Sequence, residues 1–165
     1  MAAVDYFIKI DGIDGESTDA KHKNEIDVTW YQWDVEQRGG GVGAGLGAGK
    51  AKLADFELRT RVNKAGPKLM LACASGQHIK KAVLTARKAG KDQQDFMIIT
   101  FSDLLISKFK SSGTTEEDHG REIVPTDYFA LNFSKIEFAY KEQKADGSLG
   151  GEIKAGWNVK ENKAV

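Results

Sequence analysis

The sequence predicts a mainly β protein, an antiparallel β-barrel with one short flanking α-helix. At least eight short segments alternate apolar and polar residues, as half-buried strands do. Asp-Gly and Ala-Gly pairs separate many of these segments and indicate tight turns. A single stretch consists of strong helix formers. Short strands, frequent turns and one helix are typical of a small antiparallel barrel or sandwich.

The N-terminal third predicts three strands. Val4 to Ile10 alternates in character, and Asp11-Gly12 then ends the strand at a turn that opens a polar loop. Glu25 to Val35 is the second predicted strand, and its aromatic residues on both faces indicate that it is covered on each side. Leu53 to Val62 places apolar side chains on one face and charged side chains on the other, which fits the outer wall of a sheet.

The segment from Gly66 to Gly76 predicts the helix. Pro67 suits the first helical turn, and Gly76 suits a left-handed stop. The expected helix has about ten residues, close to the usual mean length. We expect it to pack on the sheet through four side chains, those of Leu69, Met70, Ala72 and Cys73.

Strands return after the helix. Ile79 to Arg87 is one, and a hairpin turn is expected at Ala89 to Asp92. Phe96 to Phe101 and Leu104 to Phe109 are predicted as two strands separated by Ser102-Asp103. The polar, acidic stretch over residues 111–122 predicts a loop.

Tyr128 to Lys141 is the longest predicted strand. Its apolar side chains occupy odd positions before Ser134 and even positions after Lys135, so a strict two-residue period cannot place them on one face. We therefore expect a bulge of one extra residue near Ser134-Lys135, which would bend the strand towards a barrel. Ala145 to Ser148 predicts a turn, and Gly151 to Val159 the last strand.

The bulk properties favour one domain over residues 1–165 and exclude several classes. Lys plus Arg equals Asp plus Glu, 24 of each, whereas nucleic-acid binders usually show a basic excess. A single cysteine, Cys73, can form neither an internal disulfide nor a zinc site by itself. The chain has no basic, apolar leader and no long apolar run, so we expect no signal peptide and no membrane span. We expect synthesis in the cytoplasm and any export without a cleavable signal.

A glycine-rich stretch after the second strand ends at Lys50. A phosphate-binding loop would need a glycine where Ala44 stands and a hydroxyl where Ala51 stands. The relaxed dinucleotide pattern over residues 43–48 matches, but it requires a helix next, and the sequence that follows is strand-like. The alternative is a loop of small residues that orders against a partner surface.

Few residues suggest catalysis or metal binding. His22 and His78 lack ligands at helical spacing, and His119 adjoins an acidic run that could chelate a metal loosely but is more simply a solvated loop. Cys73 is most simply a small buried side chain, although His78 follows five residues later and could serve as its base. We expect no enzyme activity, no metal and no cofactor.

Two charged stretches suggest contacts between copies of the chain. Most simply, the basic one is a solvated strand face. Alternatively, it matches an acidic loop of a neighbouring copy and steers assembly. The basic residues are Lys80, Lys81, Arg87 and Lys88, and the acidic residues are Glu116, Glu117 and Asp118.

Seven stretches, spread over nearly the whole chain, follow a known order: Asp5–Ser17, His22–Val28, Pro67–Ile79, Thr85–Gly90, Leu131–Ile136, Gln143–Ser148 and Gly156-Trp157. Together they resemble the haemolysin-coregulated protein (Hcp) family, the tube subunits of the bacterial type VI secretion system, in which they occur in the same order. The glycine-rich stretch departs from the family pattern because it contains a longer run of small residues.

The resemblance implies a small β-barrel with a flanking helix and a structural role without catalysis. It implies that six copies form a ring and that rings stack into a hollow tube. A contractile sheath drives this tube, a spike protein caps it, and effector proteins travel in its lumen. Some relatives carry a further toxic domain, for which we expect no room after Trp157.

In such a tube, we expect the glycine-rich loop to form the contact between stacked rings. Two other functions stay open from the residues alone. One is a soluble β-barrel that binds a small ligand near Trp30, Tyr31 and Trp33, and the other is an enzyme that uses Cys73 with His78, or the acidic loop. The loop residues are Gly39, Gly40, Gly41, Val42, Gly43, Ala44, Gly45, Leu46, Gly47, Ala48, Gly49 and Lys50.

Overall fold

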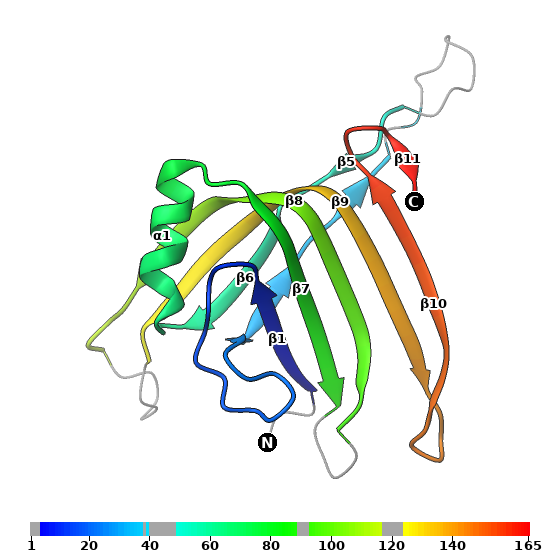
Figure 1. The fold of residues 1–165 in the computed structure, drawn as a ribbon, viewed down its shortest axis with the longest axis horizontal. Coiled ribbons are helices and arrows are strands. Elements are labelled where there is room, and N and C mark those ends of the chain that lie inside the picture. Colours follow the sequence, from blue (N-terminus) through cyan, green and yellow to red (C-terminus); the bar gives the residue numbers. More distant parts are fainter. Residues whose placement is uncertain (1–3, 38, 40–48, 89–92, 117–123) are drawn as a thin grey trace.

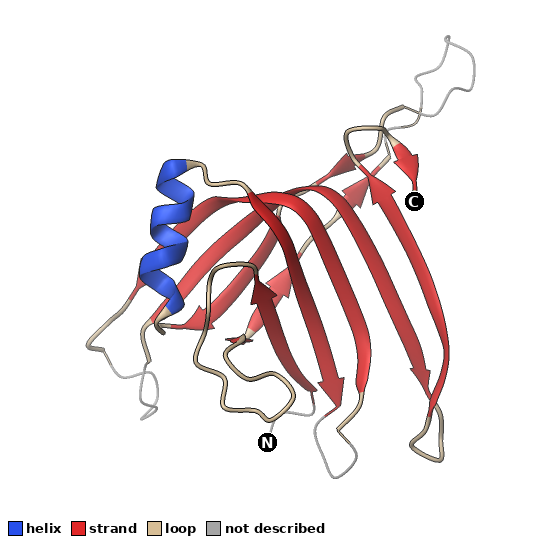
Figure 2. Ribbon diagram, viewed as in Figure 1, coloured by secondary structure: helices blue, strands red, loops and turns tan. Residues whose placement is uncertain are grey.

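A computed structural model describes residues 4–37, 39, 49–88, 93–116 and 124–165. Strands make up most of these residues, and one helix flanks them (Figure 2). In chain order, the elements are β1 (Val4–Ile10), β2 (Ile26–Val28), β3 (Trp30–Gln32), β4 (Val35–Glu36), β5 (Lys52–Leu53), β6 (Phe56–Arg61), α1 (Ala65–Ser75), β7 (Ile79–Lys88), β8 (Asp95–Ser112), β9 (Thr126–Gln143), β10 (Leu149–Asn158) and β11 (Lys163–Ala164).

The strands curl into one antiparallel sheet with the hydrogen-bonded order β11-β10-β9-β8-β7-β1-β2 (Figure 1). The first half of β9 also pairs with β6, on the edge opposite β8, and β6 in turn pairs with β3. Within the described residues, the ladder does not close into a continuous hydrogen-bonded ring. Instead, Thr29 between β2 and β3 donates its backbone N–H to Arg59 O in β6 at 2.9 Å, so the chain itself bridges the two halves. The mainly β class with one flanking helix is confirmed.

The expected second and third strands are each broken. Glu25 to Val35 becomes β2, β3 and β4, because the chain changes its pairing partner from β1 to β6 after Val28. Leu53 to Val62 becomes β5 and β6, since β5 pairs only with β4 in a separate two-stranded ladder. A short strand that the sequence did not suggest, β11, pairs with the end of β10.

Helix α1 begins and ends close to the predicted residues. Gly76 has φ 63° and donates its backbone N–H to Cys73 O at 3.3 Å, which closes the helix in the left-handed conformation that glycine adopts easily. Leu69 and Ala72 are buried against the sheet as expected. Met70 was wrongly assigned to this face, because its side chain is 50% exposed.

A bend crosses the sheet at one row of residues. Lys80 and Asp103 are left out of the regular pairing between β7 and β8. Asp103 and Ser134 are likewise left out of the pairing between β8 and β9. Asp103 has φ 51°, a conformation that few non-glycine residues adopt. The buried side chains change parity across this row in all three strands, as three pairs show: Ile79 and Ala82, Phe101 and Leu104, Phe133 and Ile136.

This bend corrects two predictions. Residues 96–109 belong to one continuous strand, β8, and Asp103 kinks that strand without ending it. β9 does change its buried face near Ser134, but no extra residue is inserted there, because the neighbouring strand makes the same change and the register is kept. The register shift between β8 and β9 lies between Ile106 and Lys108 instead.

Aromatic rings fill the core between the two halves of the sheet. Phe56 is fully buried and stacks on Tyr31, with ring centroids 5.4 Å apart. Its edge also contacts Phe101, and Trp33 lies beside it. These contacts join β3, β6 and β8, so the core supports the curl that hydrogen bonds alone do not complete.

Candidate functional site

The glycine-rich stretch lies between β4 and β5, which pair as a two-stranded ladder that projects from one end of the sheet (Figure 1). Ala54 N–H donates to Asp34 O at 3.0 Å and fixes the base of this projection. Gly39, Gly49 and Lys50 are exposed, while residues 40–48 lie outside the described residues.

The predicted basic face retains three of its four residues. Lys80, Lys81 and Lys88 are exposed on β7. Arg87 is a correction, because its side chain is only 2% exposed and points into the molecule. On the acidic side, Glu116 is exposed, whereas Glu117 and Asp118 lie outside the described residues.

Arg87 anchors the loop between β1 and β2. Its guanidinium donates two hydrogen bonds to the carboxylate of Asp19, at 2.8 and 2.6 Å, and lies 3.6 Å from a carboxylate oxygen of Asp5. The guanidinium also lies 4.9 Å from the ring centre of Phe7. The ring of Phe7 stacks in turn on the ring of His22. Hydrogen bonding to Arg87 lowers the pKa of Asp19 far below its usual value. Arg87 is therefore a structural residue of its own chain.

No hydrogen bond joins the candidate nucleophile and its base among the described residues. Cys73 is half-buried on α1, and the ring of His78 is held by Asp103, Nε2 to Oδ1 at 3.2 Å. No cluster of three metal-ligating side chains occurs among the described residues, and His119 lies outside them. No helix in the described part of the chain is long and apolar enough to span a membrane.

The three aromatic residues proposed for a ligand pocket have different surroundings. Tyr31 packs in the core, and Trp30 lies on the other face of β3 beneath the guanidinium of Arg59, 4.4 Å away. Only Trp33 lines an apolar hollow of about 270 Å³, together with Val35, Leu53, Ile136, Phe138, Ala155, Gly156 and Trp157. A shared pocket for the three rings is therefore not supported.

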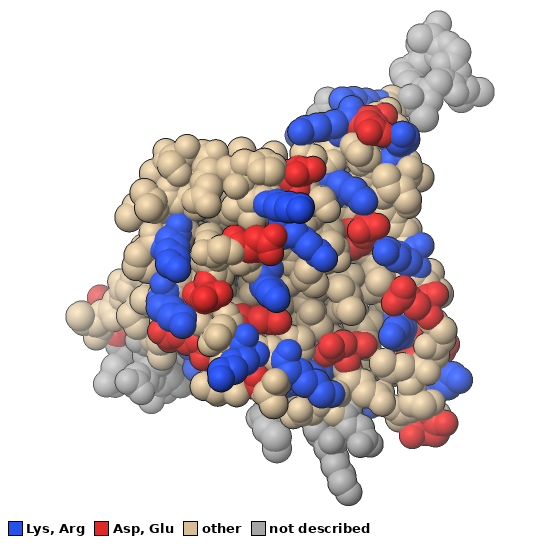
Figure 3. All heavy atoms as spheres, in the orientation of Figure 1, with Lys and Arg blue, Asp and Glu red and all other residues tan. Residues whose placement is uncertain are grey.

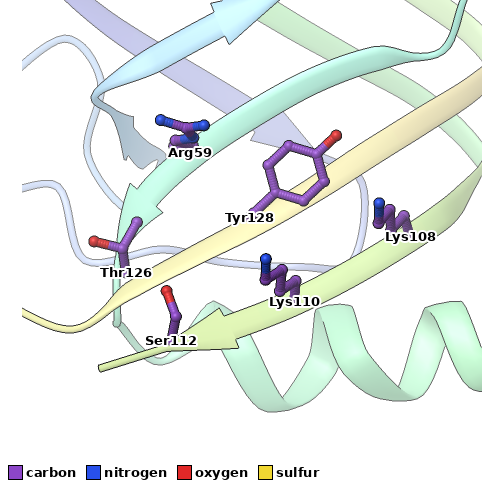
Figure 4. A pocket seen from close by; sticks show the side chains of 6 residues that line it. All are labelled: Arg59, Lys108, Lys110, Ser112, Thr126 and Tyr128. Carbon is purple, nitrogen blue, oxygen red and sulfur yellow. The ribbon is translucent and has the colours of Figure 1, made fainter. Parts of the chain in front are cut away.

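The structure reveals a basic hollow that the sequence did not suggest. It lies across β6, β9 and β8 and has a volume of about 370 Å³. We call it the basic hollow; Figure 4 shows its lining side chains, Arg59, Lys108, Lys110, Ser112, Thr126 and Tyr128. They are far apart in the sequence, so only the strand pairing brings them together. Elsewhere, the face seen in Figure 3 carries both charge signs interspersed.

Comparison with known proteins places the chain in a family. The family model described as "Type VI secretion system effector, Hcp" matches residues 7–140. Protein hcp1 of Pseudomonas aeruginosa is 42% identical over 163 residues, which is 97% of this chain and 98% of that protein.

Solved structures agree with this match. The crystal structure of Hcp1 from Salmonella typhimurium is 35% identical, with a TM-score of 0.80 over 99% of this chain and 100% of that one. A structure of a type six secretion system protein is 30% identical, with a TM-score of 0.90 and the same two coverages. The chain therefore belongs to the Hcp family, the tube and effector proteins of the type VI secretion system.

Proposed function

We propose that this chain, as one domain over residues 1–165, is the building block of the type VI secretion inner tube. Six copies close into a ring, and rings stack into a hollow tube. A spike protein caps the tube, a contractile sheath surrounds it, and effector proteins travel in its lumen. The full-length likeness to Hcp proteins carries this proposal.

The distribution of exposed apolar side chains supports ring formation. Met70 and Leu71 on α1 are 50% and 62% exposed. Ile153 is 72% exposed on β10, a strand that lies at the opposite end of the molecule from α1 (Figure 1). Two different apolar surfaces on opposite sides of a subunit suit a head-to-tail contact, which forms a ring when its rotation closes.

Secretion tests the tube role directly. We propose that the chain is made in the cytoplasm and leaves through the type VI system without a cleaved signal. In the source bacterium, the chain is expected in the culture supernatant at its full mass of 18.1 kDa. Removal of the sheath protein should abolish that signal and leave the cellular amount unchanged. Export that persists without the sheath would contradict the proposal.

We propose that residues Gly39 to Lys50 make the contact between stacked rings. The projecting β4–β5 ladder supports this, because it carries both ends of the stretch away from the sheet. Deletion of residues 40–48 should leave single rings intact and prevent tubes under crowded conditions, as seen by electron microscopy. Tubes of normal length would contradict this role.

We also propose a charge contact between neighbouring copies, with Lys80, Lys81 and Lys88 facing Glu116, Glu117 and Asp118. Exposed charges steer association and are screened by salt, so reversal of the three lysines to glutamate should slow ring assembly at low salt. Reversal of the acidic residues as well should restore the rate. Light scattering during assembly measures both effects, and an unchanged rate in the lysine variant would contradict the contact.

We propose no catalytic role for the chain. The support is geometric, because the imidazole of His78 is hydrogen-bonded to Asp103 and makes no hydrogen bond to Cys73 in the described residues. Cys73→Ser should therefore secrete and assemble like the parent chain. Loss of toxicity towards target cells in this variant, with normal secretion, would contradict the proposal.

A further inference from the structure

The basic hollow is organised by strand register. Tyr128 on β9 pairs with Arg59 on β6 and with Lys110 on β8, so these three side chains form one row across three strands. Ser112 and Thr126 pair with each other in the next row that lines the hollow. All project from the same face of the sheet (Figure 4).

The charge of the hollow is unbalanced. Three cationic side chains line it, those of Arg59, Lys108 and Lys110, and no carboxylate does. None of the three forms an ion pair with a described residue, although the chain as a whole carries equal numbers of acidic and basic residues. Like charges held together on one surface repel, and a bound anion would relieve that repulsion.

Two of the cations are held in place by aromatic rings. The guanidinium of Arg59 lies 4.4 Å from the ring centre of Trp30, and the ammonium of Lys108 lies 5.4 Å from that of Tyr128. The hydroxyl of Tyr128 is itself fixed because it donates to Glu57. Side chains that are already ordered lose less entropy when a ligand binds.

Tyr128 adds no negative charge to the hollow. Burial, followed by the hydrogen bond to Glu57, raises the pKa of its phenol to about 12. The phenol therefore stays neutral under physiological conditions. The carboxylate of Glu57, which accepts its hydrogen bond, lies beside the hollow and offsets part of the positive charge of the three cations.

The spacing of the cations fits an acidic protein segment. Lys108 and Lys110 lie two residues apart on one strand, which places them about 7 Å apart, and carboxylates at alternate positions of an extended segment have the same spacing. Arg59 can bind a further carboxylate with two parallel hydrogen bonds. Tyrosine and arginine are also enriched in protein interfaces. Nucleic acid is a poorer fit, since three cations would release few counterions.

We propose that the basic hollow binds an extended acidic segment of a partner protein, with glutamate or aspartate at alternate positions. Arg59, Lys108 and Lys110 contact the carboxylates, and Ser112 and Thr126 supply neutral donors. The identification of the partner as a protein carried in the tube rests on the proposed function; the binding of an acidic segment by the hollow does not.

Fluorescence anisotropy tests the hollow with a short labelled peptide that carries glutamate at alternate positions. The peptide should bind the full chain, and the same peptide with glutamine in place of glutamate should not. Lys110→Gln should weaken binding about tenfold, as expected for loss of one charge-assisted hydrogen bond, and Arg59→Gln should weaken it at least as much, because Arg59 can donate two. Lys68→Gln removes an exposed lysine on α1 and should leave binding unchanged.

Equal binding of the two peptides would overturn the proposal, as would equal weakening by Lys68→Gln and Lys110→Gln. Tighter binding of a single-stranded oligonucleotide than of the glutamate peptide would also overturn it. Thermal melting confirms that each variant is folded. Gel filtration of the same samples reports ring formation independently. If rings do not form, the peptide result still tests the hollow; if the peptide does not bind, the gel-filtration result still tests the proposed function.

Discussion

Loss of Arg87 should destabilise the protein more than any other charge substitution on β7. In Arg87→Met, the apolar stem is kept while Asp19 loses two charge-assisted hydrogen bonds, of 2.8 and 2.6 Å. Removal of one partner from a buried ion pair costs roughly 3–5 kcal/mol. The side chain of Asp19 is 20% exposed, so water can solvate it in part, and we expect the lower end, about 3 kcal/mol.

Urea unfolding at one fixed protein concentration measures this loss, and a thermal scan should show a fall in melting temperature of roughly 6–12 °C. Lys88→Met is the matched control, because Lys88 is the exposed neighbour of Arg87 and its substitution removes the same charge. We expect the free energy of unfolding of this variant to change by no more than about 0.5 kcal/mol. The double variant Arg87→Met with Asp19→Asn should recover part of the loss, since it leaves no unpaired charge. A loss below about 1 kcal/mol in Arg87→Met would refute the reasoning.

Three further predictions concern pH, a close backbone contact and the helix. The folded-state pKa of Asp19 lies below its unfolded value of 3.8, so the stabilisation from ionised Asp19 is fully present above that pH and is lost as the pH falls further. In Asp19→Asn, the urea midpoint should therefore fall less steeply at acid pH than in the parent chain. An unchanged pH profile would contradict this. Gly156→Ala would place the new Cβ 2.9 Å from Ile136 O, a backbone atom that cannot easily move. Calorimetry should therefore show a lower melting temperature for this variant, and an unchanged melting temperature would contradict the close backbone contact. Leu69→Ala should cost about 2–5 kcal/mol in urea unfolding and Met70→Ala under about 1, because only Leu69 is buried; equal losses would count against the assigned helix face.

Local chemistry predicted the elements that local residues control. Gly76 ends α1 as expected, and Gly12 and Gly147 adopt positive φ at the predicted turns. The alternation of β6 was also read correctly, with Phe56 and Leu58 buried.

Predictions failed where the outcome depends on partners distant in the sequence. The kink at Asp103 belongs to a row across three strands, so the alternation within β9 suggested an inserted residue that is not there. Arg87 looks like part of an exposed basic run, and only the loop that brings Asp19 against it explains its burial. The basic hollow combines residues from β6, β8 and β9, and no short motif contains them.

The solution mass of the purified chain tests the tube proposal most directly. Light scattering after gel filtration, with negative-stain images of the same peak, should give six times the 18.1 kDa of one chain and ring-shaped particles. A mass of one chain at every concentration measured, with no rings in the images, would contradict the account.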